Sequence, residues 1–441
     1  MKHFSTGAIF SVFTIALISS FCLATDAGAA EKTLSRTEDF VVVTGADVPE
    51  LLGSEIADIR LYSCSGGPCV PVPVQVDKVD STGRYVFPEE INRDRDGSKL
   101  DENDEMAFMA EDAGTTCPSG WKPEGAKGKG VKIVLVDPVD GGKGTLYLFN
   151  MPGTSVPDVP DYVSYRIEGE NTIIESQQFI MGYKSDRISY DRIQLMSSSG
   201  EMGPDILDRQ RVGMEAHMAG GGSLPVVAPE SIVKASDIGV IDGPVRVILD
   251  QVVLVEIGAI SLKWGTEYFI KYYRCGQNNS VFYEFPMGPN QLFKTILFYW
   301  SLDFTPDVIG SYYIDPNRDE PVPITEENRE GVPDDASHFW WGMYGPQGAL
   351  YQALDLDDDM HPYFTCDGRW RQDPRAKIRD GDYPGRLEIG FNCHEVGDIP
   401  EETEYHWFNY ILFPSQPSAE GVEELRAMVE DPLEVKISAV P

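Results

Sequence analysis

The residue types best suited to binding chemistry in this chain lie between positions 92 and 105. Residues that can offer oxygen ligands occupy alternate positions around Gly97, and further carboxylates follow closely. A loop of this kind can wrap oxygen ligands around a hard cation, because glycine permits the sharp turn. Carboxylates placed so close together also repel one another unless a cation neutralises them. The segment therefore predicts a structural calcium site with the ligands Asn92, Asp94, Asp96, Ser98, Asp104 and Glu105.

The spacing departs from that of an EF-hand. If Asn92 is the first ligand, the twelfth position is Asn103, where an EF-hand has a bidentate glutamate. The preceding residues, from Gly83 to Pro88, have an extended rather than a helical pattern. A solvated acidic turn and a catalytic metal site are the alternative interpretations. A second acidic cluster at residues 355–359 lacks glycine and alternate spacing, and is interpreted as a solvent-facing turn.

Aromatic residues in the C-terminal third suggest a sugar-binding groove. The adjacent side chains of Trp340 and Trp341, together with Trp370, could stack on the apolar faces of sugar rings. His338 stands just before this pair and could transfer a proton. The alternative is that the aromatic rings fill the core of the protein.

Two arginines next to Trp370 suggest that the ligand is acidic. The guanidinium groups of Arg369 and Arg371 could bind a carboxylate in a bidentate manner, as a uronate-containing glycan would require. In a lyase- or epimerase-like reaction, Arg369 would neutralise the uronate carboxylate and His338 or a tyrosine would act as the base. The alternative is that these arginines only neutralise nearby acids. The predicted catalytic residues are thus His338 and Arg369, with Trp340, Trp341, Trp370 and Arg371 as ligand-binding residues.

Six of the seven cysteines follow the first 30 residues, and an even number in an exported chain indicates disulfides. There is no Cys-x-x-Cys motif, so a metal-binding role for the cysteines is less favoured. A Ser-Gly-Gly-Pro turn separates the first two cysteines, and the last two bracket a possible hairpin. The expected pairs are Cys64–Cys69, Cys366–Cys393 and, by elimination, Cys117–Cys275.

Short β-branched and aromatic segments bounded by Gly, Pro or Asp predict an all-β protein. Hairpins are expected for residues 131–136 with 145–149 and for 162–168 with 172–180. A meander of long strands is expected for 243–285, beginning with separate strands at 243–249 and 252–257. Helices are expected only at residues 229–235 and 419–430, and residues 200–222 have the composition of a loop. No repeat of fixed period is visible, which argues against a propeller or solenoid.

The order of several segments resembles that of secreted bacterial proteins with the galactose-mutarotase-like supersandwich, which are associated with polysaccharide utilisation. The segments are Val72–Asp77, Asp94–Gly97, Asn103–Ala110 and Gly243–Arg246, ahead of the long strands. The resemblance covers residues 40–310 and implies a large antiparallel β-supersandwich with few peripheral helices. It also implies a carbohydrate-related role, as a binding protein, a lyase or an epimerase-like enzyme. No catalytic residue of that group could be matched to this chain.

The N-terminus predicts export. Lys2 and His3 precede an apolar run, and small residues at 27–30 predict a signal peptide over residues 1–29. A transmembrane anchor is the alternative, but serine and threonine interrupt the run. Residues 30–441 are expected to form one β-sandwich unit. Its expected portions are a calcium-loop portion at 30–160, a long-strand meander at 161–310 and an aromatic and acidic portion at 311–441.

The net charge of −35 excludes nucleic acid as a natural partner, because so acidic a surface repels phosphates. A high-salt environment would also account for the acidity. Taken together, the residues predict a periplasmic or secreted protein that binds an acidic glycan, or binds and modifies it as a lyase- or epimerase-like enzyme. The alternative is a non-catalytic, calcium-stabilised envelope or surface protein.

Overall fold

The computed structural model describes residues 31–66, 68–88, 97–185, 189–218, 226–228, 233–257, 260–264, 267–284, 293–326, 339–358, 360–363, 365–371, 387–394 and 404–440. These residues form antiparallel sheets with a single α-helix, so the predicted all-β class is confirmed. Among them, no helix is long and apolar enough to cross a membrane.

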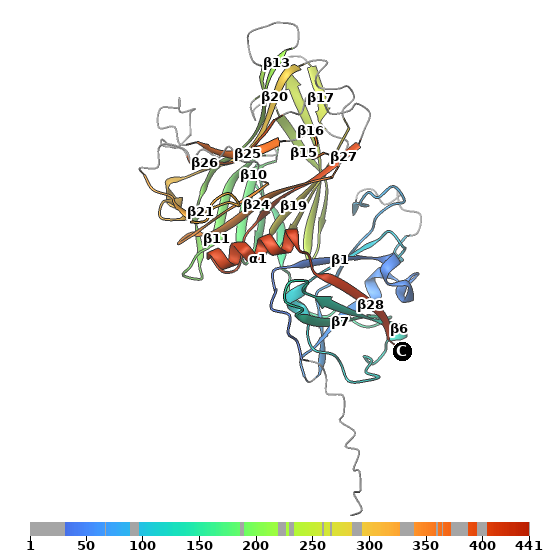
Figure 1. Cartoon of the computed structure of the whole chain (residues 1–441). Coiled ribbons are helices and arrows are strands. Elements are labelled where there is room, and N and C mark those ends of the chain that lie inside the picture. Colours follow the sequence, from blue (N-terminus) through green and yellow to red (C-terminus); the bar gives the residue numbers. More distant parts are fainter. Residues whose placement is uncertain are drawn as a thin grey trace, which may run out of the picture.

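The described residues up to Asn150 and the last strand form a separate small body, here called the N-terminal module (Figure 1). One of its sheets has three strands, in the order β1 (Phe40–Thr44), β5 (Glu105–Met109) and β4 (Gln75–Asp77). The other has five, in the order β28 (Glu434–Val440), β6 (Lys127–Val136), β7 (Lys143–Asn150), β2 (Ile59–Cys64) and β3 (Cys69–Val72). The predicted hairpin of 131–136 with 145–149 is the β6–β7 pair.

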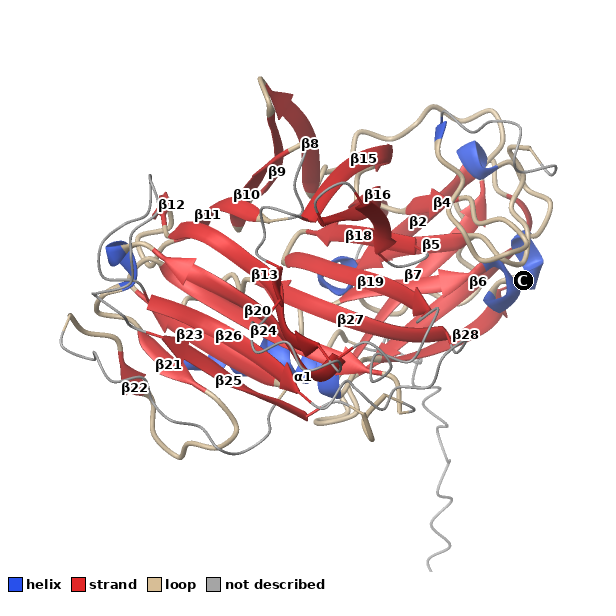
Figure 2. Cartoon of the chain, turned by 90° about the horizontal axis from the view of Figure 1, so that it is seen from above, coloured by secondary structure: helices blue, strands red, loops and turns tan. Residues whose placement is uncertain are grey.

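The remaining strands form a sandwich body (Figure 2), one layer of which consists of two five-stranded sheets. The first runs β12 (Met202–Asp205), β11 (Tyr190–Met196), β10 (Phe179–Lys184), β9 (Asn171–Ser176) and β8 (Val163–Glu168). The second runs β14 (Val226–Ala228), β13 (Leu207–Met218), β20 (Phe293–Phe304), β26 (Leu387–His394) and β25 (Thr365–Arg371).

The opposing layer is a ten-stranded sheet, here called the central sheet. Its first strands are β15 (Val233–Asp242), β16 (Arg246–Ile257), β18 (Glu267–Tyr273), β19 (Gly276–Glu284) and β27 (Glu404–Leu412). It continues with β24 (Gly348–Leu356), β23 (Trp340–Gly345), β21 (Tyr312–Ile314) and β22 (Val322–Pro323), while β17 (Ile260–Trp264) pairs with β16.

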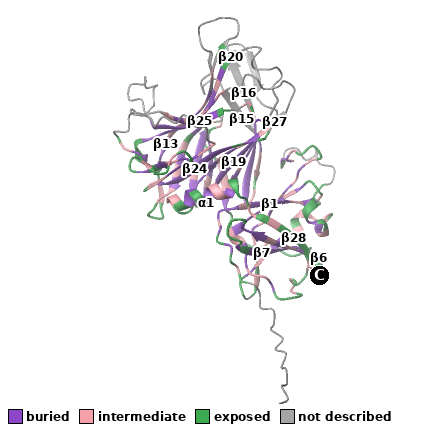
Figure 3. Ribbon diagram, in the orientation of Figure 1, coloured by how far each residue is buried: buried purple, intermediate pink, exposed green. Residues whose placement is uncertain are grey.

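The main core lies between these two layers. Both five-stranded sheets send apolar side chains toward the central sheet, where they pack in one cluster with Trp341 and Ile411. The contact is direct, since the hydroxyl groups of Tyr190 on β11 and Tyr272 on β18 lie 2.8 Å apart. Figure 3 shows the buried residues following the strands, with exposed residues mainly at loops. Because side chains alternate between the two faces of a strand, the other face of the central sheet is left for other contacts.

The one α-helix among the described residues is α1 (Ala419–Glu430), which matches the predicted helix. The Ser418 hydroxyl caps its N-terminus by accepting a hydrogen bond from the Gly421 N–H group. Its buried side chains, including Val422 and Leu425, pack on the outer face of the central sheet beside Tyr351. After α1 the chain enters β28, so the C-terminal strand returns to the N-terminal module (Figure 1).

Three predicted elements were wrong. The segment predicted as a helix at 229–235 ends in strand β15, which begins at Val233, while 229–232 lie outside the described residues. The segment predicted as a loop at 200–222 contains β12 and most of its length is β13. Strand β13 pairs with β20 from Leu207 to Met218, and such tertiary pairing overrides local composition. Residues 246–257, expected as two strands, form the single strand β16.

The N-terminal module contacts the sandwich body through a buried polar group of residues, here called the interface network. Arg246 on β16 is fully buried and donates to Asp77 on β4, with 2.8 Å between Nε and Oδ2. It also donates to Glu105 on β5 at 2.7 Å. A Cβ atom added to Gly243 would lie 2.4 Å from Oε1 of Gln75, so a larger residue there would have to displace the Gln75 side chain. Three of the four segments that carry the family resemblance therefore meet at this interface.

Candidate functional site

The structure does not assemble the predicted aromatic groove. Trp341 is completely buried between the layers of the sandwich, and its indole Nε1 donates to Gln352 at 3.0 Å. Trp370 packs against the same core, edge-on to Tyr313 with ring centroids 4.9 Å apart. Trp340 points to the opposite face of the central sheet, where the guanidinium of Arg426 lies over its ring. The three tryptophans therefore do not share one surface.

Arg369 is engaged by the protein itself. Its Nε donates to Glu388 at 2.5 Å, its Nη1 donates to Asn392 at 2.7 Å, and its guanidinium stacks over Tyr299. Burial alone would raise the pKa of Glu388. The charge of Arg369 and the hydrogen bonds to the carboxylate outweigh burial, so the pKa of Glu388 is lower than usual. Glu388 therefore already occupies the position in which a substrate carboxylate was expected to bind.

The remaining predicted residues of this groove are only partly described. His338 lies outside the described residues, and Arg371 is described only as the last residue of β25. The catalytic pairing of His338 with Arg369 stays a prediction.

The calcium loop is likewise described only in part, because Asn92, Asp94 and Asp96 lie outside the described residues. The Ser98 hydroxyl donates to Glu55. Both oxygens of the fully buried Asp104 accept hydrogen bonds, from Lys78 and from the backbone N–H groups of Val79 and Asp101. A calcium site that included Asp104 would have to displace the ammonium group of Lys78.

Glu105 has protein partners as well, since it accepts hydrogen bonds from Arg246 and Tyr85. Burial raises its pKa, but the charges of Arg246 and Lys271 outweigh burial and lower it. Glu105 thus belongs to the interface network, and calcium binding by the loop itself stays a prediction.

Two of the predicted cysteine pairs are present and the third was wrong. Cys366 and Cys393 are cross-strand partners in β25 and β26 and form a disulfide. Cys64 lies within bonding distance of Cys69, as predicted, but also of Cys117. Cys275 is a buried free thiol at the turn between β18 and β19. It packs in the sandwich body beside Leu412, whereas Cys117 lies in the N-terminal module. Elimination by number could not detect this separation.

The sequence did not single out a polar and aromatic strip on the outer face of the central sheet. Two rows of cross-strand partners make up this strip. In the first row, Asn278 on β19 pairs with Lys271 on β18 and with Tyr410 on β27. In the second row, Phe408 on β27 pairs with Ser280 on β19 and with Asp355 on β24. The Asn278 amide hydrogen-bonds the Tyr410 hydroxyl, and Oδ1 of Asn278 is buried without a partner among the described residues. The strip thus offers aromatic rings together with hydrogen-bonding groups.

A cleft of about 330 Å³ opens where this strip meets the N-terminal module. Its floor is formed by Asp355 of β24 and Tyr410 of β27. One wall comes from β1, including Phe40, and the other from the end of α1 and the segment that leads into β28, including Met428 and Leu433. The cleft therefore lies at the junction of the two bodies, which is a common place for ligand sites.

The end of the strip that lines the cleft is acidic, because it carries Asp355. Partial burial and the nearby charge of Asp357 raise the pKa of Asp355, while His361 and His406 oppose this rise. Burial raises the pKa of Tyr410, so its hydroxyl remains a neutral donor. Further along β27, the Nε2 of His406 lies 2.8 Å from the Ser280 hydroxyl. These groups can donate to and accept from hydroxyl groups, and they disfavour an anion.

A signal for the strip was present in the sequence of β27. His406, Phe408 and Tyr410 alternate with Trp407, Asn409 and Ile411, as expected for a strand with two different faces. Alternation does not show which face is covered by another layer and which is open. The outward face was recognisable only once α1 and the N-terminal module had been placed.

Comparisons with known proteins identify no family. No protein-family model matches the chain, and no curated protein matches it. Among solved structures, the chain is similar to an alpha-mannosidase from Enterococcus faecalis V583, with 8% sequence identity and a TM-score of 0.39. The match covers 93% of this chain and 46% of the mannosidase, so the chain spans about half the length of that protein. Similarity at this level does not indicate what this chain binds.

Proposed function

We propose that this protein is an extracytoplasmic carbohydrate-binding protein whose ligand lies in the cleft between the central sheet and the N-terminal module. The observation that carries the proposal is the combination of Tyr410, Asp355 and the unpartnered Asn278 oxygen beside a cleft of about 330 Å³. Sugars are bound in proteins by aromatic rings against their apolar faces and by polar side chains on their hydroxyl groups. The Cys366–Cys393 disulfide supports a periplasmic or secreted location.

The cleft favours uncharged sugars over acidic ones. The preference for an acidic glycan depended on Arg369 and Arg371, and Arg369 is engaged by Glu388. Asp355, with Asp357 nearby, would repel a uronate. A lyase- or epimerase-like activity depended on His338 together with Arg369, so binding alone is proposed.

A glycan array that includes neutral and acidic polysaccharide fragments tests this proposal. The wild-type protein should retain neutral glycans, and Tyr410→Ala should weaken binding at least about tenfold, equivalent to 1.4 kcal/mol. Tyr312→Ala is a matched control, because Tyr312 is an exposed tyrosine on β21 of the same sheet and should bind like the wild type. Retention of acidic glycans alone, or binding unaffected by Tyr410→Ala, would show that the cleft is not the site.

A second candidate function is a non-catalytic, calcium-stabilised envelope or surface protein. One observation favours it: the predicted groove residues Trp341, Trp370 and Arg369 are buried or engaged by the protein instead of lining an open surface. Running the same array with calcium and with a chelator separates the two functions. If no glycan were bound and the melting temperature fell strongly under chelator, the envelope or surface protein would be supported.

A further inference from the structure

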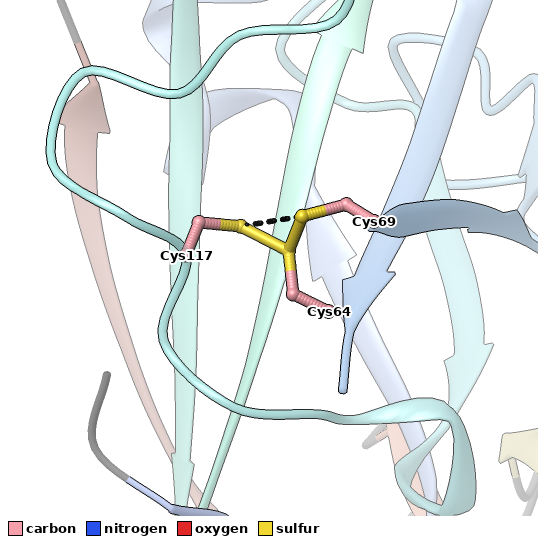
Figure 4. A group of neighbouring side chains, drawn as sticks. All are labelled: Cys64, Cys69 and Cys117. Carbon is pink, nitrogen blue, oxygen red and sulfur yellow. Dashed lines mark hydrogen bonds between the residues drawn. A yellow bond between two sulfur atoms is a disulfide. The ribbon is translucent and has the colours of Figure 1, made fainter. Parts of the chain in front are cut away.

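Three cysteines from two separate segments of the N-terminal module converge in one place (Figure 4). Cys64 ends β2, Cys69 begins β3, and Cys117 lies on the loop that follows β5. Their sulfur atoms all lie within 4.8 Å of one another, and the sulfurs of Cys69 and Cys117 are 3.1 Å apart. Cys64 is within bonding distance of both partners. A sulfur atom can take part in only one disulfide, so the oxidised cluster always keeps one thiol.

The backbone supports both bonds of Cys64. Cys64 and Cys69 are cross-strand partners with Cα atoms 4.1 Å apart, and the Cα atoms of Cys64 and Cys117 are 5.9 Å apart. The first separation equals that of the Cys366–Cys393 disulfide, and the second is typical of disulfides in general.

Contacts other than disulfides hold the loop against β2. The N–H and hydroxyl groups of Thr115 donate to the carbonyl oxygen of Cys64 at 2.6 and 3.0 Å, respectively. The N–H of Cys117 donates to the Tyr147 hydroxyl at 2.9 Å. A Cβ atom added to Gly114 would lie 2.1 Å from the Cys64 carbonyl oxygen, so only glycine permits this close approach. The loop therefore stays in place whichever partner Cys64 has.

We propose that this cluster is an intramolecular thiol–disulfide exchange site in which Cys64 is shared between Cys69 and Cys117. In one direction, the Cys117 thiolate attacks the Cys64 sulfur, the Cys64–Cys117 bond forms, and Cys69 leaves as a thiolate. The proton lost by Cys117 returns to Cys69 through solvent. The number of disulfides and thiols is unchanged, so the step needs no external oxidant or reductant. Its rate depends on the thiolate fraction and therefore rises with pH toward the thiol pKa.

Alkylation of the native protein followed by peptide mapping tests the proposal. The protein is oxidised in air and incubated without added thiol at about pH 8.5, which is near the pKa of a free cysteine. It is then labelled. We expect one label per cluster, divided between Cys69 and Cys117. The buried Cys275 is an internal control for folding, because it should be labelled only in denaturant, and the Cys366–Cys393 pair should remain unlabelled throughout.

Two variants and a second preparation complete the test. Cys69→Ser should contain the Cys64–Cys117 bond and Cys117→Ser the Cys64–Cys69 bond, each with no label in the cluster. Wild-type protein that has been reduced and reoxidised should reach the same division of label as untreated protein, because exchange erases the history of the sample. Labelling of one cysteine only, or a division that stays different between the two preparations, would overturn the proposal. Three labels that appear only after a metal chelator is added would instead indicate a metal site and would also overturn it.

Discussion

Arg246 and Asp77 form a buried ion pair that connects the sandwich body to the N-terminal module, with 2.8 Å between Nε and Oδ2. Arg246 is 0% exposed and also donates to Glu105 and to the Tyr273 hydroxyl. Gln75 accepts hydrogen bonds from the backbone N–H groups of Val245 and Arg246. Because the contacts with Asp77, Glu105 and Gln75 are made only when the two bodies are together, we propose that residues 30–441 unfold as one cooperative unit.

Replacing Arg246 should therefore destabilise the whole chain. Arg246→Met leaves the buried Asp77 and the half-buried Glu105 without their main cation, and breaking such a pair costs about 3–5 kcal/mol. Urea denaturation followed by tryptophan fluorescence measures this loss. Arg166→Met is the control, because Arg166 forms a surface pair with Glu168 and Glu175 and should cost less than about 1 kcal/mol. Equal losses in the two variants would argue against a role of the network in coupling the bodies.

Asp112 should make stability depend on pH. Burial raises the pKa of Asp112 to about 6, despite the hydrogen bond from the Tyr162 hydroxyl. The folded state thus holds a proton between about pH 4 and 6 that the unfolded state has released, so the contribution of Asp112 to stability decreases as pH rises through this range. Asp112→Asn removes the titration, and its stability relative to wild type should increase from pH 4 to 6 and then level off. A constant difference across urea titrations at these pH values would refute this assignment.

The calcium dependence of the melting temperature should differ between variants of the loop residues and a variant of Asp104. If the loop binds calcium, Asp94→Asn and Asp96→Asn should abolish the rise in melting temperature that calcium produces. Asp104→Asn should lower the melting temperature equally with calcium and with chelator, because Asp104 accepts hydrogen bonds from Lys78 and the backbone. Differential scanning calorimetry under both conditions measures these shifts. If Asp104→Asn alone removed the calcium effect, Asp104 would be a ligand after all.

The two adjacent tryptophans should differ sharply when substituted. Trp341→Ala removes a ring that is fully buried in the sandwich core and should cost about 3–5 kcal/mol of unfolding free energy. Trp340→Ala removes a half-buried ring beside α1 and should cost clearly less. Urea denaturation of the two variants side by side measures the difference, and similar losses would contradict the assignment of these residues to opposite faces of β23.

The sequence determined those features of this protein that depend on neighbouring residues. Alternating apolar residues and Gly-rich turns predicted the β6–β7 hairpin, and the pattern at 419–430 predicted α1. Cysteines on either side of a turn or hairpin predicted the Cys64–Cys69 and Cys366–Cys393 pairs. These features could be predicted because hydrogen bonding and turn geometry act over a few residues.

Only the tertiary structure decided which surfaces are covered and which groups become partners. Period-two alternation assigns Trp340 and Trp341 to opposite faces, but packing of the other layer determines that Trp341 is the buried one. In the same way, the pairing of β25 with β26 places Arg369 beside Glu388. The position of the 110–121 loop places Cys117 beside Cys64, so Cys117 does not pair with Cys275. The cleft at Tyr410 arises where α1, β1 and the central sheet meet. Contacts between residues so distant in the chain leave no local pattern, because they depend on how completed sheets pack against one another.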